Sequence, residues 1–173
     1  MAVTRFRQNF NCAQSVFVAF AAQLGMDESQ ALKLSSPFGG GVARRGQICG
    51  AVTGALMALG LAQGADTPAG KEDAYRLGQE FLQRFESKHA TILCRELIDC
   101  DISTPEGRQQ ASEKGAFTAL CPLFVRDAAE IVQAILVKKP SINPARNGRM
   151  QQACLRPPSS ETPSIPKTHF NLL

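Results

Sequence analysis

The chain has 173 residues, of which 44% are hydrophobic and 20% are charged, which is enough for one globular domain with a buried core. Its formal charge of +4 is small, and residues 140–173 supply +3 of it through four basic residues against one acidic residue. Proteins that bind nucleic acid cluster Lys and Arg on one face, and no such cluster occurs, so we expect no nucleic-acid partner.

Residues 1–10 lack the apolar stretch that a secretory signal needs before its cleavage site, so we expect a cytoplasmic protein. The first predicted helix has Asn11 as its N-cap and ends near Leu24, where Gly25 is expected to take a left-handed conformation. A second, short helix is predicted to begin at Asp27 and to end near residue 35.

The middle of the chain contains an irregular loop and then an apolar helix. Residues 36–46 are predicted to be a loop, because a proline, three consecutive glycines and two arginines leave no regular pattern. The uncharged stretch that follows contains five glycines, and its apolar part, residues 48–62, is shorter than the ~20 residues that cross a membrane. We therefore predict no membrane span but the buried central helix of a bundle. Gly46, Gly50 and Gly54 recur every four residues, which allows the close approach of a helix or a ligand.

Four more helices are predicted in the second half of the chain. Thr67 and Thr104 are each followed by proline, which is typical of a helix start, and these two helices are expected to end near residues 88 and 114. The first of them has an apolar stripe at the spacing of one face: Leu77, Phe81, Leu82 and Phe85. A short helix is predicted at residues 92–98, and the last one from Cys121 to Lys138.

No stretch of the chain alternates between apolar and polar residues with a period of two. The sequence therefore predicts an all-α fold, a compact helical bundle of about five to seven helices, over residues 1–139. Residues 140–173 hold six of the ten prolines and are rich in Ser, Thr and Asn. Because this composition cannot bury enough apolar surface to fold alone, we expect an extended Pro-rich tail.

Cysteine is the residue type that points to function. Six cysteines exceed what packing requires in a reducing compartment, where cysteine serves metal binding or redox chemistry more often than structural disulfides. Cys12, Cys49 and Cys121 each fall at the start of a predicted helix, where unpaired N–H groups and the helix dipole favour the thiolate. If these helices run parallel, the three thiols could converge at one end of the bundle, and Cys94 could join them as a fourth.

The other cysteines are interpreted as secondary. Cys100 lies between Asp99 and Asp101, whose charges oppose a thiolate, and Cys154 lies in the tail. The sequence has no C-x-x-C motif, which disfavours a zinc ribbon and a thioredoxin-type site, and no C-x-x-C-H motif, so we expect no haem.

The loop before Cys49 is expected to affect that thiol. It could act as a glycine-rich lid, or hold an anion near the start of the central helix, although it lacks the Lys-Ser/Thr ending of a P-loop. Arg45 is expected to lower the pKa of Cys49 further. The two histidines, His89 and His169, form no recognisable triad and are interpreted as surface residues, so the sequence does not decide whether the protein is an enzyme.

Four elements of the chain together resemble the C_GCAxxG_C_C family: N-C-A-Q at residues 11–14, C-G-A-V-T-G at residues 49–54, Cys94 and Cys121. The resemblance extends over roughly residues 9–137. It implies an all-helical, prokaryotic domain with four shared cysteines and a redox role that is assigned because of them. Cys100, Cys154 and the tail lie outside the pattern.

Three functions remain open at this point. The first is a redox-active protein that uses Cys12, Cys49, Cys94 and Cys121 for thiol–disulfide chemistry or electron transfer with an unidentified redox partner. In the second, these four cysteines ligate a metal ion or an iron–sulfur cluster, with Gly50, Gly54 and Arg45 beside the cofactor. The third is a non-catalytic helical interaction module in which the cysteines only pack. A homodimer through an exposed helix face is compatible with all three.

Overall fold

The computed structural model describes residues 1–64 and 67–138. Over these ranges the chain forms eight α-helices and no strand, which confirms the predicted all-α bundle. The helix that the sequence analysis missed is α1 (Ala2–Arg7). The predicted tail, with Cys154 and His169, lies outside the described residues, so the predicted boundary after residue 139 stays a prediction.

Local capping explains where the first helices begin. In α2 (Cys12–Ala21), the Asn11 side chain accepts a hydrogen bond from the Gln14 N–H at 3.0 Å, and the Gln14 side chain accepts one from the Asn11 N–H at 3.1 Å. This reciprocal capping box makes Cys12 the first residue of the helix. The helix ends at Ala21, three residues before the predicted end.

The second cap is also as predicted, because the Asp27 side chain accepts a hydrogen bond from the Gln30 N–H at the start of α3 (Glu28–Ser35). Gly25, just before it, has the expected left-handed conformation with φ +84°. One turn of 3₁₀-helix, η1 (Ser36–Phe38), follows α3, so the first three residues of the predicted loop are regular after all.

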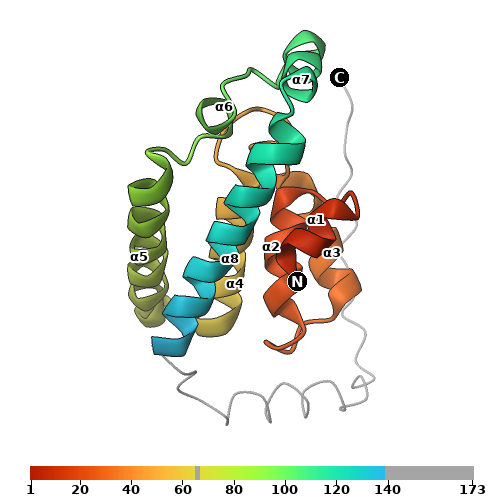
Figure 1. Ribbon diagram of the computed structural model, residues 1–173. Coiled ribbons are helices and arrows are strands. Elements are labelled where there is room, and N and C mark those ends of the chain that lie inside the picture. Colours follow the sequence, from red (N-terminus) through yellow and green to blue (C-terminus); the bar gives the residue numbers. More distant parts are fainter. Residues whose placement is uncertain (65–66, 139–173) are drawn as a thin grey trace, which may run out of the picture. The chain divides into compact units, whose positions relative to one another are not determined.

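The predicted central helix is α4 (Gly50–Gln63), with Cys49 as its N-cap, and it contacts α2, α5 and α8 (Figure 1). Its glycine face lies against α2. A Cβ atom at Gly54 would lie 2.5 Å from the Ala13 carbonyl oxygen, which is too close for any side chain. The absence of a side chain at Gly54 therefore sets how closely α2 and α4 approach each other.

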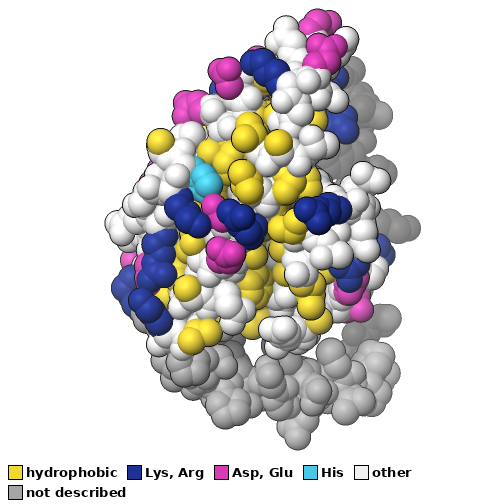
Figure 2. Space-filling model, viewed as in Figure 1, with side chains coloured by type: hydrophobic (Ala, Val, Ile, Leu, Met, Phe, Trp, Pro, Cys, Tyr) yellow, Lys and Arg dark blue, Asp and Glu magenta, His cyan; other side chains and the backbone are white. Residues whose placement is uncertain are grey.

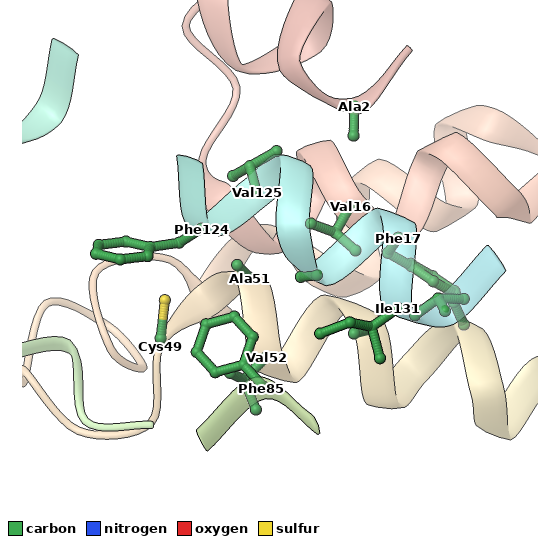
Figure 3. Close-up of a cluster of buried hydrophobic side chains, with 14 of the residues drawn as sticks. Ala2, Val16, Phe17, Cys49, Ala51, Val52, Phe85, Phe124, Val125 and Ile131 are labelled. Atoms are coloured by element: carbon green, nitrogen blue, oxygen red, sulfur yellow. The ribbon is translucent and has the colours of Figure 1, made fainter. Parts of the chain in front are cut away.

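Two long helices complete the core. In α5 (Lys71–His89), which follows the 3₁₀ turn η2 (Pro68–Gly70), three members of the predicted apolar stripe are buried, and Leu82 is partly buried. The apolar face of α8 (Cys121–Lys138) packs against α4 and α5, as Figures 1 and 3 show. The residues that α8 buries are Cys121, Phe124, Val125, Asp127, Ala128, Ile131, Val132 and Ile135.

One end of the bundle is covered by shorter elements (Figure 1). These are α6 (Cys94–Leu97), α7 (Pro105–Glu113) and η3 (Ala116–Leu120), a π-helical turn that leads directly into α8. The predicted cap at Thr104 is confirmed, since its hydroxyl accepts a hydrogen bond from the Gly107 N–H at 3.0 Å. The prediction that the last helix begins at Cys121 is confirmed, and η3 directly precedes it.

None of the helices within the described ranges combines the length and hydropathy that a membrane crossing requires. The apolar character of α4 is instead accounted for by burial between its neighbours, since seven of its residues are buried.

His89 lies at the surface, as the sequence analysis expected, but most of its side chain is buried. Its side chain is 14% exposed, and its ring lies 4.6 Å from that of Phe85 and 5.0 Å from that of Phe124. His89 Nε2 lies 3.1 Å from Asp127 Oδ2 but makes no hydrogen bond within the described part of the chain. Figure 2 shows the one described histidine at the surface, with basic and acidic side chains next to it.

The protein is expected to lose stability as the pH falls from 7 to 5. Burial lowers the pKa of His89 below its ordinary value of 6.5, so the unfolded chain takes up a proton in this range more readily than the folded one. Burial raises the pKa of Asp127, but hydrogen bonds from Arg126 and Lys88 outweigh it, so this carboxylate stays charged and adds to acid sensitivity only below pH 4. Thermal unfolding should show a smaller pH dependence in the His89→Phe variant; an unchanged dependence would contradict this.

Candidate functional site

The structure brings the four sequence-predicted cysteines together at the end of the bundle that α6 and η3 cover. Cys12 begins α2, Cys49 caps α4, Cys94 begins α6 and Cys121 begins α8. Three of them are buried, with exposed fractions of 3% for Cys49, 7% for Cys94 and 6% for Cys121, whereas Cys12 is partly exposed. They are close enough for the ionisation of one to affect the others, and all are free thiols.

A pairing of two loop segments holds Cys49 and Cys94 in place. The Cys49 N–H donates to the Ile92 carbonyl at 2.8 Å, and the Cys94 N–H donates to the Gln47 carbonyl at 2.7 Å, around an isolated antiparallel bridge between Ile48 and Leu93. Arg95 extends the pairing, because its Nε donates to the Gly46 carbonyl and its Nη2 to that of Arg45. This pairing joins segments more than forty residues apart and has no local sequence signal.

Glycines let the backbone approach two of the thiols. A Cβ atom at Gly50 would lie 3.0 Å from Cys12 Cβ, and one at Gly41 would lie 2.7 Å from Cys94 Cβ. At Gly50 and Gly54 the space is thus occupied by α2, so these glycines serve helix packing and do not open room for a bulky cluster. Their predicted contact with a cofactor stays a prediction.

Cys12 and Cys121 are close enough for a hydrogen bond between their side chains, and this bond is the largest influence on the pKa of each. This bond raises the pKa of Cys12 well above its usual value, and burial raises it further. The same bond lowers the pKa of Cys121, against the opposing effect of burial. Cys12 is therefore the proton-bearing donor of the pair, and Cys121 is the thiol that ionises more readily.

Cys49, like Cys12, does not have the lowered pKa that its predicted helix start implies, and the pKa of Cys94, for which no such prediction was made, is raised as well. Burial raises the pKa of Cys49 to about 11, although the backbone N–H groups of Ala51 and Val52 at the start of α4 oppose it. Burial raises the pKa of Cys94 to about 12, with a small opposing effect of the Arg95 charge. The expectation from helix ends was wrong here because removal from water outweighs the helix N-terminus. Figure 3 shows Cys49 at the edge of the buried cluster, beside Phe124.

Two further residues differ from their predicted surroundings. Arg45 does not lower the pKa of Cys49 as expected; its carbonyl accepts the Arg95 hydrogen bond instead. Cys100 is buried at 8% exposure and forms a hydrogen bond with Lys114, whereas the Asp99 side chain that was expected to oppose it is 97% exposed.

An open cavity of about 970 Å³ reaches the cysteine pair. Cys12, Cys94 and Cys121 all line it, while Cys49 lies behind them. Three arginines and three phenylalanines also line the cavity: Arg7, Arg44, Arg108, Phe6, Phe10 and Phe117. A molecule that enters the cavity can therefore reach the Cys12–Cys121 pair from solvent.

The wall of this cavity includes an unusual backbone turn. Five consecutive residues, from Gly40 to Arg44, have φ between +50° and +66°, which forms a left-handed turn. Val42, Ala43 and Arg44 carry a Cβ, and for such residues this conformation costs about 1–2 kcal/mol each. Hydrogen bonds such as that from the Ala43 N–H to the Pro37 carbonyl, at 2.7 Å, hold the turn. Backbone strain of this kind is typical of functional sites.

The donor set does not fit a metal site in its present arrangement. Within residues 1–64 and 67–138, no three side chains among His, Cys, Asp and Glu are placed so that they could hold a metal ion together. To ligate a metal, Cys49 and Cys94 would have to lose the protons that they carry at neutral pH in the metal-free protein.

Comparison with known proteins gives one match. The family model described as "Putative redox-active protein (C_GCAxxG_C_C)" matches residues 10–135, a range that contains all four converging cysteines. No curated protein matches the chain in sequence, and no solved structure matches it.

Proposed function

Since the chain belongs to the C_GCAxxG_C_C family of redox-active proteins, we propose that it carries out thiol–disulfide exchange through the pair Cys12 and Cys121. The observation that carries this proposal is the hydrogen bond between the two thiols at the wall of an open cavity. Exchange requires an attacking thiolate, a second thiol within bonding reach and access for a substrate. This pair is the one among the described cysteines that combines all three.

The proposed reaction has two steps. In the first, the Cys121 thiolate attacks a sulfur of a substrate disulfide, a Cys121–substrate mixed disulfide forms, and the first substrate thiolate leaves. In the second, Cys12 gives its proton to the departing thiolate and attacks Cys121 Sγ, which releases the second substrate thiol. The products are a Cys12–Cys121 disulfide, one substrate thiolate, which takes a proton from water, and one substrate thiol, so two electrons pass from the protein to the substrate.

Cys94 and Cys49 are not members of the first exchanging pair in this proposal. Both stay protonated at neutral pH, because their pKa values are about 12 and about 11. Cys94 lines the cavity and Cys49 does not, so Cys94 is the thiol that a bound substrate would meet next. Electron transfer beyond the first pair would therefore begin at Cys94.

A cysteine-ligated metal or iron–sulfur cluster is the second candidate function. The observation in its favour is the convergence of four cysteines from four separate elements, which is typical of such centres. The raised pKa values and the donor arrangement weigh against it. The open cavity beside the thiols does not support the third candidate, an interaction module with packed cysteines.

Thiol counting on protein purified without air distinguishes these candidates. We expect oxidation with a small disulfide to remove two titratable thiols, reduction to restore them, and peptide mass spectrometry to locate a Cys12–Cys121 bond. The Cys12→Ser variant should instead accumulate the mixed disulfide on Cys121, because the resolving thiol is absent. The Cys100→Ser variant serves as a control that should behave like the unmodified protein.

The possible outcomes distinguish the three candidate functions. Stoichiometric iron with absorbance near 400 nm in the purified protein would support the cluster and overturn exchange as the function. If all six thiols resist oxidation, the interaction module with packed cysteines is the candidate that remains. The predicted cytoplasmic location and prokaryotic source fit a protein whose thiols are re-reduced between turnovers, and both stay predictions.

A further inference from the structure

We propose that the cavity beside Cys121 binds a small disulfide that carries negative charge, such as a carboxylate on each half. This inference rests on the proposed exchange function and adds the class of its substrate. It comes from the cavity wall, which contains three arginines and three phenylalanines.

The charged part of the wall is entirely positive. Arg7, Arg44 and Arg108 line the cavity, and the described residues around it include no Asp or Glu. None of the three arginines takes part in an ion pair within the described ranges. Their concentration is local, because residues 1–139 carry a net charge of only +1. Uncompensated guanidinium groups at a concave site attract anions, and carboxylates match their geometry.

Two of the arginines are held in place by the backbone around them. Arg108 Nη1 donates to the Ile102 carbonyl at 3.2 Å and to the Ser103 carbonyl at 3.4 Å, which orients the guanidinium without neutralising it. Arg44 lies at the end of the strained left-handed turn, where its N–H donates to the Gly39 carbonyl at 3.3 Å. The strained turn places the cationic Arg44 at the cavity wall. We infer that this placement is the reason why the energetic cost of the turn is tolerated.

The size and the apolar part of the wall suit a small molecule. A volume of about 970 Å³ lies at the upper end of the range for small-molecule sites, roughly 300–1,000 Å³. Phe6, Phe10 and Phe117 offer contact to the hydrocarbon part of a ligand. The arginines would also stabilise the anionic thiolate that leaves when Cys121 attacks, so the same charges favour binding and exchange.

The test compares three disulfides of different charge on the reduced full-length protein: dithiodipropionate as a dianion, bis(hydroxyethyl) disulfide as a neutral molecule and cystamine as a dication. Each rate of Cys121 oxidation is divided by the rate of the same disulfide with free mercaptoethanol, which removes differences between leaving groups. At low ionic strength we expect the normalised rate of the dianion to exceed that of the neutral disulfide by about tenfold. The excess should shrink in high salt, because added salt screens charges.

Substitution locates the effect. Arg44→Gln and Arg7→Gln should each lower the normalised rate of the dianion more than that of the neutral disulfide. Arg76→Gln is the matched control, since Arg76 is exposed on α5, pairs with Asp73 and does not line the cavity. This variant should prefer the dianion over the neutral disulfide as strongly as the unmodified protein does. The salt dependence of the unmodified protein tests the proposal independently if a variant does not fold.

The possible failures are distinguishable. Equal normalised rates for the three disulfides, or a preference that salt and both substitutions leave unchanged, would overturn the anionic substrate while exchange itself stands. Failure of all three disulfides to oxidise Cys121 would overturn the proposed exchange function and this inference with it.

Discussion

Replacement of Cys121 by alanine is expected to lower the summed alkylation rate of residue 121, Cys49 and Cys94 at pH 7 by at least about tenfold. Cys12 is counted separately, because the hydrogen bond that raises its pKa is lost with Cys121. Only the thiolate reacts, and a thiol with the ordinary pKa of 9.0 is about 1% ionised at this pH. Cys121 exceeds that fraction because its pKa is lowered. Cys49 and Cys94 have pKa values of about 11 and 12. Their ionised fractions at pH 7 are therefore roughly a hundredfold and a thousandfold lower than that of a thiol with the ordinary pKa.

The measurement is iodoacetamide labelling followed by peptide mass spectrometry, so that Cys100 and Cys154 are counted separately. Cys49→Ala is the matched control, because it removes a buried thiol of the same cluster and should leave the rate nearly unchanged. A rate that Cys121→Ala leaves unchanged, or that Cys49→Ala lowers as strongly, would contradict the assignment of Cys121 as the reactive thiol.

The pH dependence of the same reaction tests the hydrogen bond itself. The rate at Cys121 should rise with pH and reach its midpoint below 9.0, because the bond from Cys12 stabilises the thiolate. In the Cys12→Ala variant the donor is lost, so the midpoint should move to higher pH. In Cys12→Ser a hydroxyl can still donate, and part of the shift should be restored. A midpoint that is the same in all three proteins would refute the role of Cys12 as donor.

A second large effect is expected from Gly54→Ala, which should lower the free energy of unfolding by about 1–3 kcal/mol. The added methyl group would lie 2.5 Å from the Ala13 carbonyl oxygen and 3.0 Å from Ala13 Cα. Both are backbone atoms of α2, so the clash can be relieved only if the two helices move apart. Because Cys12 precedes Ala13, this movement should also weaken the hydrogen bond to Cys121 and slow Cys121 alkylation.

Gly60→Ala in the same helix is the matched control. A Cβ atom at Gly60 would meet no atom within 4 Å, so the substitution should raise stability by up to about 1 kcal/mol through helix propensity alone. Urea denaturation of both variants measures the difference. Equal stability changes for Gly54→Ala and Gly60→Ala would show that the contact between α2 and α4 is not tight at Gly54.

Much of the fold could be predicted because it depends on short-range interactions. The caps at Asn11, Asp27 and Thr104 each involve a side chain and an N–H three residues later, so the local sequence contains everything that forms them. The apolar faces of α5 and α8 follow from helical periodicity in the same way. The terminal helix α1 and the π-helical turn η3 carried no comparable local signal.

The candidate site was predictable in its members but not in its chemistry. The positions of Cys12, Cys49 and Cys121 at the starts of predicted helices were enough to expect convergence. They did not indicate that Arg95 and the pairing around Ile48 and Leu93 hold the second pair of thiols. Nor did they indicate the left-handed turn from Gly40 to Arg44, because only glycine signals such a turn and three of its residues are not glycine.

The sequence by itself determined that this protein is an all-α bundle of a redox-active family, with three cysteines at helix starts and a fourth expected nearby. Only the tertiary structure decided which thiols touch and which one ionises. The reason is physical: a helix start favours a thiolate through a few local N–H groups, whereas burial and a neighbouring thiol act through contacts that every packed element contributes. At Cys49 burial outweighs the helix start, and at Cys121 the hydrogen bond from Cys12 outweighs burial.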